Sequence, residues 1–290
     1  MSPETDQYPV SRREPSPKAA KPGSGDASDR VRLFAADAAA WIRFFSRLPL
    51  PRVNPLDDPA AAPQFERSAR AAPFAGFVVA LPAAGLGMLL AYTSLPTLAV
   101  AAFAVALLAA TTGALHEDGL SDVADGFFGG ATRDRRLEIM KDSRIGSFGA
   151  LALALSVLLR VVLLAALWQR FDPADAALLF LATESISRTL LVWQWYQHPL
   201  ARPQGLAARF GKPDGNALKQ AVLVSVPLLA PAVLLLSIPA LFLALVLAIG
   251  AAFFVGYIAE KKIGGVTGDV LGAIQQICGL GFLTGMLMVP

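Results

Sequence analysis

The feature that most constrains the fold of this chain is a series of long apolar segments. An α-helix rises about 1.5 Å per residue, so about 20 apolar residues cross the hydrocarbon core of a bilayer, which is about 30 Å thick. Hydrophobic residues make up 55% of the chain and charged residues only 16%, which is too apolar for a soluble domain of this length. We therefore predict an all-α, polytopic membrane bundle of about seven transmembrane helices. Segments of the required length lie near residues 74–95, 96–115, 147–168, 174–195, 217–237, 238–258 and 270–289.

Two segments of different character precede the first span. Residues 1–30 are rich in Pro, Ser and charged residues and have no apolar run, which predicts a disordered tail without a signal peptide. In residues 31–50, apolar residues are interleaved with Arg and Asp at helical spacing, which predicts an amphipathic helix that Pro49 and Pro51 end. This pattern suits a helix at the membrane interface and a helix packed on the bundle equally well. Residues 31–290 are expected to form one helical transmembrane domain.

The distribution of basic residues indicates how the spans are oriented. Lys and Arg gather before the first span and in the segments 116–146, 196–216 and 259–269, whereas the connections on the other side contain only Arg170. Because basic loops stay in the cytoplasm, these segments are expected there and the C-terminus outside. The basic residues form no clustered stripe, so we expect no nucleic-acid partner. The single Cys278 excludes an intramolecular disulfide and a CxxC metal site.

Three charged residues, Arg160, Glu184 and Arg188, fall inside the predicted spans. A charge at the centre of a span costs about 2.5–3.5 kcal/mol on the insertion scale, so these side chains should face the interior of the bundle. Glu184 and Arg188 are four residues apart, which is the spacing of a helical ion pair. Two interpretations stay open: an ion pair that ties helices together, or a cation directed toward a phosphate-bearing substrate.

The segment 116–146 contains a pattern that points to chemistry. Asp118, Asp122 and Asp125 occur at helical offsets of zero, four and seven, so they fall within about 60° on one helix face. Converging carboxylates repel one another unless a cation lies between them, and hard oxygen ligands favour Mg²⁺. A solvated loop with ordinary ion pairs is the alternative. We predict a magnesium site at these three aspartates.

The second half of the same segment is basic, and its residues suit a phosphate group. A metal-bound phosphate needs Arg or Lys to neutralise its remaining charge. We expect Arg133, Arg136, Lys141 and Arg144 to bind a diphosphate. The alternative is that these residues only fix the orientation of the chain in the membrane.

Two shorter polar segments share this character. FGKPDG at 210–215 contains Lys212 and Asp214, although an ordinary turn explains it equally well. GGVTG at 264–268 is followed by Asp269 and opens the last span. Glycine-rich backbone at the start of a helix is suited to binding phosphate.

Several of these runs together resemble one enzyme family. HEDGLSDVADGFFGG at 116–130 and RRLEIMKDSRIGSFGALAL at 135–153 resemble the signature of the cobalamin synthase family, the adenosylcobinamide-GDP ribazoletransferases. FFSRLPLP, FGKPDG and GGVTGD resemble other landmarks of that family in the same order. The similarity spans roughly residues 35–285, and the long signature is highly specific. Glu117 stands where some relatives are expected to have an apolar residue, but the aspartates are intact.

The resemblance implies a reaction. Adenosylcobinamide-GDP and α-ribazole, or its 5′-phosphate, join to give adenosylcobalamin, or its 5′-phosphate, and GMP, with Mg²⁺ required. A ribose hydroxyl attacks the cobinamide-side phosphorus of the diphosphate and displaces GMP, and in such transfers positioning and charge neutralisation supply most of the catalysis. The resemblance also implies a multi-pass protein of the bacterial inner membrane, in contact with lipid and with its active face in the cytoplasm. A homo-oligomer is left open.

The resemblance and the patterns above also give the expected site residues. We expect the catalytic residues to be Asp118, Asp122, Asp125 and Asp142, the first three as metal ligands. The expected substrate-binding residues are His116, Arg133, Arg136, Lys141, Arg144, Arg188, Lys212, Asp214 and Asp269.

Two other classes of protein fit parts of the pattern. Asp122-x-x-Asp125-Gly126 also resembles CDP-alcohol phosphotransferases, but such enzymes are expected to have an aspartate quartet over two consecutive helices, which the spacing of Asp142 does not complete. A transporter would use the intramembrane charges as a substrate path, with polar groups at the midplane in both halves. Here the polar residues concentrate at one membrane face, which favours an enzyme.

Overall fold

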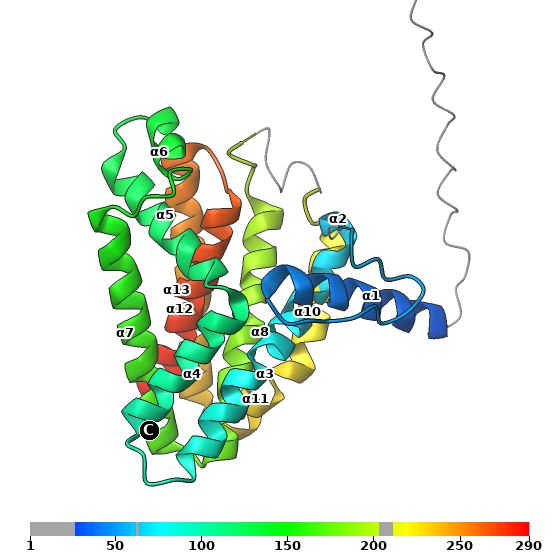
Figure 1. Ribbon diagram of the computed structural model, residues 1–290, viewed down its shortest axis with the longest axis vertical. Helices are drawn as coiled ribbons and strands as arrows, with labels where there is room; N and C mark the ends of the chain where they lie inside the picture. The colour runs from blue at the N-terminus through cyan, green and yellow to red at the C-terminus, as the bar shows by residue number, and fades with distance from the viewer. Residues whose placement is uncertain (1–26, 62–63, 203–210, 290) are drawn as a thin grey trace, which may run out of the picture.

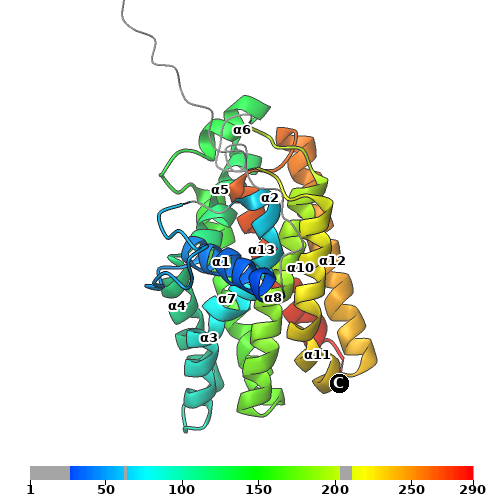
Figure 2. The ribbon, with the colours of Figure 1, turned by 90° about the vertical axis from the view of Figure 1, so that its right-hand side faces the viewer.

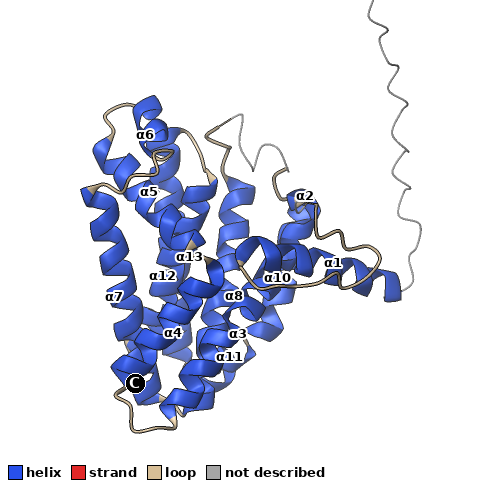
Figure 3. Ribbon diagram, in the orientation of Figure 1, coloured by secondary structure: helices blue, strands red, loops and turns tan. Residues whose placement is uncertain are grey.

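The computed structural model describes residues 27–61, 64–202 and 211–289. All regular secondary structure in these ranges is helical, which confirms the predicted all-α class (Figures 1 and 3). The helices are α1 (Ala27–Phe45), α2 (Phe65–Ser68), η1 (Ala69–Ala71), α3 (Ala72–Ala91), α4 (Thr97–Thr112), α5 (Leu115–Gly129), α6 (Arg133–Ile139), α7 (Ser147–Arg170), α8 (Pro173–Gln197), α10 (Gly215–Leu228), α11 (Ala230–Leu235), α12 (Ile238–Ile263) and α13 (Gly268–Leu287).

Five helical segments of the described chain are long and apolar enough to cross a membrane. They are Phe65–Ala91, Ser147–Arg170, Pro173–Gln197, Ile238–Ile263 and Gly268–Leu287. α4 and α5 together add a sixth if they are counted as one broken span, because they meet at an angle of 88°. The chain is therefore a multi-pass membrane protein, with fewer unbroken spans than the seven expected.

The expected span at 96–115 is interrupted by its backbone conformation. α4 ends at Thr112, and both Gly113 (φ 64°) and Ala114 (φ 55°) then adopt the left-handed conformation that ends helices. α5 starts in a new direction, so much of the segment expected as a loop from residue 116 is helical.

The expected span at 217–237 is divided into α10 and α11. Pro227 lies near the end of α10 and Pro231 in the first turn of α11. Because proline lacks the amide hydrogen that continues a helix, the two prolines favour a break here. Within the described residues, neither piece is long enough to cross a membrane alone.

The chain runs repeatedly between the two ends of the bundle, in α3, α4 with α5, α7, α8, α10 with α11, α12 and α13 (Figures 1 and 2). One end, called the polar end below, carries residues 130–146, 198–202 and 264–267. Backbone hydrogen bonds join two of these segments, from Val266 to the carbonyl of Pro199 (2.8 Å) and from Ala201 to that of Val266 (2.9 Å). Three of the polar segments that the sequence singled out therefore lie at one end of the bundle.

α8 and α13 form the centre of the bundle. The apolar windows of these helices are 89% and 78% buried, whereas those of α7 and α12 are 28% and 22% buried. α13 packs closely on α12 because Gly281 and Gly285 leave no side chain between them; a Cβ at Gly281 would lie 2.9 Å from the carbonyl oxygen of Leu247. The site described below is built on these two interior helices together with α1, α2 and α5.

α1 lies across the bundle beside α3 (Figure 2), and its second half is packed on it. Asp37 pairs with Arg67 (3.0 Å) and Arg70 (2.8 Å), and Trp41 donates a hydrogen bond to Ser68 (3.1 Å). α1 is therefore packed on the bundle, as one of the two interpretations of the amphipathic helix expected. Ala27–Arg30 begin α1 rather than ending a disordered tail, and residues 1–26 of that expected tail lie outside the described residues.

The three intramembrane charges form one buried cluster. Arg160 of α7 pairs with Glu184 of α8 at 2.8 Å, and Arg188 pairs with the other oxygen of the same carboxylate. Two glutamines of α13 add hydrogen bonds to this cluster. Gln275 donates one to Glu184 (3.2 Å), and Gln276 accepts one from Arg160 (3.1 Å). The interpretation as an ion pair that ties helices together is confirmed.

Candidate functional site

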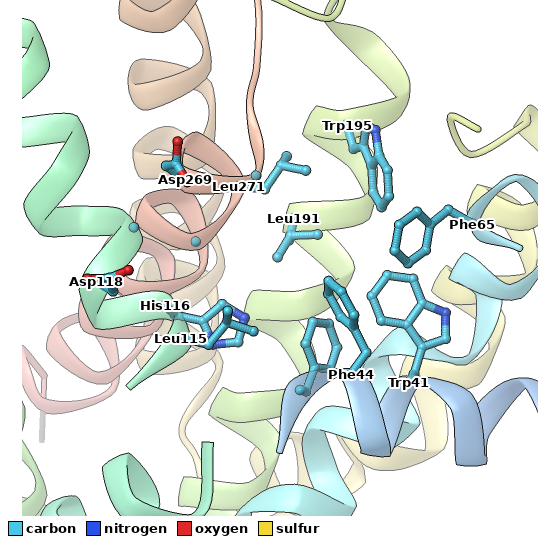
Figure 4. A pocket seen from close by; sticks show the side chains of 14 residues that line it. Trp41, Phe44, Phe65, Leu115, His116, Asp118, Leu191, Trp195, Asp269 and Leu271 are labelled. Carbon is cyan, nitrogen blue, oxygen red and sulfur yellow. The ribbon is translucent and has the colours of Figure 1, made fainter. Parts of the chain in front are cut away.

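A cavity of about 160 Å³ lies between α1, α5, α8 and the beginning of α13 (Figure 4). Aromatic side chains form one side of it, and the carboxylates of Asp118 and Asp269 lie on the opposite side. His116 and Leu115 lie between the two sides. A pocket with a mainly apolar lining and a few placed polar groups is the usual form of a small-molecule site.

The aromatic side of the cavity comes from three separate helices. Trp41 and Phe44 belong to α1, Phe65 to α2 and Trp195 to α8. The ring of Phe65 lies 4.9 Å from that of Trp41, 4.9 Å from that of Trp195 and 5.3 Å from that of Phe44. Rings at these distances pack on one another, so the wall is a continuous aromatic surface.

The acidic side depends on the close approach of α5 to α13. A Cβ at Gly119 would lie 2.8 Å from the backbone oxygen of Asp269, and one at Gly272 would lie 3.3 Å from the Cα of His116. Only glycine allows helices this near, and their contact puts Asp118 of α5 beside Asp269 of α13. The hydroxyl of Thr267 donates a hydrogen bond to the Asp269 carboxylate (3.2 Å).

The three aspartates expected to share a metal have different surroundings. Asp118 lines the cavity, and Asp122 interacts electrostatically with Asp118, Asp269 and Asp125. Asp125 is buried, and its two oxygens accept hydrogen bonds from the amides of Gly146 (2.7 Å) and Gly149 (2.8 Å). Asp125 therefore caps the first turn of α7. Within the described residues, no group of three or more His, Cys, Asp or Glu is arranged to hold a metal ion.

The basic residues expected to bind a diphosphate have partners in the protein. Arg133 donates hydrogen bonds to the carbonyls of Ile263 (2.8 Å) and Ala201 (2.6 Å). Arg136 donates to the carbonyls of Gly130 (2.9 Å) and Lys262 (3.0 Å). Both arginines therefore join the segments of the polar end to one another. Their role toward a substrate stays a prediction.

Arg144 is exposed and pairs with Asp142. This pairing lowers the pKa of the Asp142 carboxyl from 3.8 to about 2. Lys141 is exposed as well, next to this pair. The pair lies in an open depression that Asp125 also lines, away from the aromatic cavity.

The remaining expected residues lie in three places. His116 lines the cavity, with its ring 5.3 Å from that of Phe45. Arg188 lies behind this wall, with its guanidinium 5.3 Å from the Phe45 ring centre. Asp214 caps α10 by accepting a hydrogen bond from Ala217 (2.6 Å), and burial lowers the pKa of the nearby Lys212. Phe210 of the FGKPDG run lies outside the described residues.

Sequence reasoning missed the aromatic wall and Arg202. The aromatic residues of α1 recur at helical spacing, which indicates that they share one face of the helix but not what that face contacts. Arg202 acts electrostatically on Asp122 and Asp269 and donates a hydrogen bond to the carbonyl of Leu137 (2.9 Å). Its Nε is buried and, among the described residues, has no hydrogen-bond partner. In the sequence, Arg202 was only one of several loop charges.

Fold and cavity define an all-α, multi-pass membrane protein with an aromatic and acidic site where α13 begins. Residues 37–287 match the family described as cobalamin-5-phosphate synthase, and the chain belongs to this family. The family resemblance is thereby confirmed.

Three relatives illustrate the match, and each is an adenosylcobinamide-GDP ribazoletransferase. The chain is 44% identical over 255 residues to that of Azorhizobium caulinodans, covering 87% of this chain and 96% of the relative. It is 45% identical over 259 residues to that of Brucella anthropi, with coverage of 87% and 96%. For Allorhizobium ampelinum, the identity is 40% over 259 residues, with coverage of 88% and 97%. No solved structure matches the chain.

Proposed function

We propose that this chain joins adenosylcobinamide-GDP and α-ribazole, or its 5′-phosphate, to give adenosylcobalamin, or its 5′-phosphate, and GMP. The observation that carries the proposal is one cavity with an aromatic wall facing two carboxylates, in a chain of this family. A ribose hydroxyl forms a new bond to the cobinamide-side phosphorus, and the bond from that phosphorus to GMP breaks. The hydroxyl proton passes to a cavity carboxylate or to water.

The aromatic wall suits the base of α-ribazole. A flat base packed on this wall, whose most exposed ring is that of Phe44, gains stacking energy of about 1–3 kcal/mol per base. Its ribose then lies toward the opposite wall, where Asp118 and Asp269 are located. This arrangement places the attacking hydroxyl next to the carboxylates and holds the base away from them.

Magnesium fits the acidic side of the cavity. Mg²⁺ in proteins is usually held by one or two carboxylates, several waters and the phosphates of the substrate. Asp118 and Asp269 are suited to be these carboxylates, and Asp122 lies one helical turn from Asp118. Asp125 is less suited, because its oxygens already accept hydrogen bonds from two backbone amides. When bound, the ion would neutralise charge on the diphosphate and stabilise the leaving group.

We further propose that the polar end faces the cytoplasm and that the membrane is the bacterial inner membrane. The polar end contains Arg133, Arg136 and Arg144, whereas the turn from α7 to α8 at the opposite end carries only Arg170. This asymmetry follows the positive-inside rule. An impermeant thiol reagent should therefore fail to label a cysteine at Ala131 in intact cells, in a protein whose Cys278 has been replaced. Labelling there would contradict the orientation.

The activity can be tested with purified protein in detergent. Adenosylcobinamide-GDP, α-ribazole and Mg²⁺ should yield adenosylcobalamin and GMP in equal amounts. Asp118→Asn should lower kcat/KM at least 100-fold, roughly 3 kcal/mol of transition-state stabilisation. The matched control is Asp134→Asn, which removes the same charge from α6, where the side chain is 92% exposed. Absence of product, or turnover of a CDP-alcohol lipid substrate instead, would refute the proposal.

A further inference from the structure

A second space of similar size adjoins the aromatic cavity. It has a volume of about 170 Å³ and lies where α1 ends beside the break between α4 and α5. Phe44 and Leu115 line both spaces, so a ligand in the aromatic cavity is separated from the second space by two apolar side chains. These two side chains are 37% and 40% exposed.

Two arginines line this second space, and they differ in their partners. Arg43 is already engaged: it donates hydrogen bonds to Asp57 (2.9 Å) and to the carbonyl of Leu50 (3.0 Å). The pairing with Arg43 lowers the pKa of the Asp57 carboxyl, so the pair is ionised at neutral pH. Arg43 therefore has little capacity left for a ligand.

Among the residues that the structure describes around this space, Arg47 is the cation without a partner, and it is exposed. Within the described part of the chain, its guanidinium has no carboxylate partner and donates no hydrogen bond, although its backbone amide donates to the carbonyl of Thr111 (2.7 Å). The guanidinium rests on Gly113, where a Cβ would lie 2.7 Å from Nε. The absence of a side chain at Gly113 thus leaves room for Arg47 beside this space, and the arginine retains all its donors for an anion.

The chemistry of the two nucleosides indicates which anion this is. When α-ribazole 5′-phosphate replaces α-ribazole, the 5′-phosphate is retained in the product, so the attacking hydroxyl is another one. With the base on the aromatic wall and the attacking hydroxyl at Asp118 and Asp269, the 5′ end of the ribose is free to extend toward Phe44 and Leu115. Arginine binds phosphate through two parallel hydrogen bonds, which suits a terminal phosphate at that position.

We infer that Arg47 binds the 5′-phosphate of the nucleotide substrate and so determines how well the enzyme uses α-ribazole 5′-phosphate relative to α-ribazole. This inference rests on the proposed function. It assigns Arg47 a specificity role, separate from the chemistry at the carboxylates. The other phosphate group that Arg47 could bind is the diphosphate of adenosylcobinamide-GDP. The experiment below distinguishes these two ligands.

The test compares kcat/KM for the two nucleosides at saturating adenosylcobinamide-GDP and Mg²⁺. Arg47→Gln should lower the value for α-ribazole 5′-phosphate by about 10- to 100-fold, the usual range for a lost hydrogen bond to a charged group. The value for α-ribazole should change less than about threefold, which also shows that the variant is folded. Arg47→Lys keeps the charge but not the paired donors, so its loss for the phosphorylated substrate should be intermediate.

Arg52→Gln is the matched control, because Arg52 lies nearby, donates to the carbonyls of Asn54 and Pro55, and lines neither space. It should leave both values unchanged. Equal losses for both nucleosides in the Arg47 variants, or a raised KM for adenosylcobinamide-GDP, would overturn the inference while leaving the proposed function intact. If the unaltered protein turned over neither nucleoside, the proposed function and the inference would both fail.

Discussion

Replacement of Asp125 by asparagine separates a structural role of this carboxylate from a catalytic one. Both oxygens of Asp125 accept amide hydrogens, from Gly146 and Gly149. Asparagine keeps one acceptor, but its NH₂ group faces an amide that also needs to donate. One hydrogen bond to a charged group is lost, at about 1.5–3 kcal/mol, and the negative charge at the start of α7 adds about 0.3–1 kcal/mol. We expect a total loss of about 2–4 kcal/mol.

Asp118 provides the comparison on the same helix. Its carboxylate is exposed in the cavity and accepts no hydrogen bond from the described residues. Asp118→Asn should therefore change the free energy of unfolding by less than about 0.5 kcal/mol, although it removes most activity. The two asparagine variants thus have opposite profiles: one is destabilised, the other is stable and inactive.

The assay is thermal unfolding in one detergent, followed by circular dichroism, together with initial rates over a Mg²⁺ titration. Asp125→Asn should lower the Tm by several degrees. The protein that stays folded should need the same Mg²⁺ concentration for half its maximal rate as the unaltered protein. Asp118→Asn should have the Tm of the unaltered protein, and its residual activity should need a higher Mg²⁺ concentration to reach half its maximum. If Asp125→Asn kept its Tm and lost Mg²⁺ affinity as Asp118→Asn does, the capping argument would be wrong and Asp125 would be a metal ligand.

Three further outcomes follow from the described contacts. Glu184→Gln leaves two buried guanidinium groups without a counter-charge, so it should lower the stability in detergent by about 3–5 kcal/mol, measured by thermal unfolding. Gly119→Ala pushes α13 away from α5 and should lower kcat/KM about 100-fold, with unchanged helix content by circular dichroism. Since Arg144 lowers the Asp142 pKa to about 2, this pair should persist above pH 4 and be lost as the pH falls through about 2. Arg144→Gln should return the carboxyl titration, followed by ¹³C NMR, toward 3.8.

The sequence was sufficient for those properties that depend on local composition. Apolar length predicted the all-α membrane class, and the signature around Asp118 predicted the family. The count of spans was less accurate because hydropathy measures length and apolarity alone. Two consecutive left-handed residues after Thr112 and the prolines at 227 and 231 divide segments that an apolar average treats as continuous.

The site was predicted only in part, since its geometry depends on distant segments. Helical spacing places Asp118, Asp122 and Asp125 on neighbouring positions of one helix, but it contains no information on which amides come near them. Asp125 meets the first turn of α7, while Asp269, from the far end of the chain, lies beside Asp118. The aromatic wall is assembled from α1, α2 and α8, so no local pattern marks it. Magnesium stays a prediction.

The buried cluster of Arg160, Glu184 and Arg188 also has a consequence for biogenesis. Only Phe171 and Asp172 separate α7 from α8, and Glu184 follows Arg160 by 24 residues, so the two helices leave the ribosome in direct succession. α7 alone would carry an unpaired guanidinium into lipid, whereas the hairpin of α7 and α8 brings the carboxylate that pairs with it. The two helices are therefore suited to leave the translocon laterally as one unit. α8 carries Glu184 together with Arg188 of the same helix, so it is Arg160 of α7 that depends on this order of synthesis.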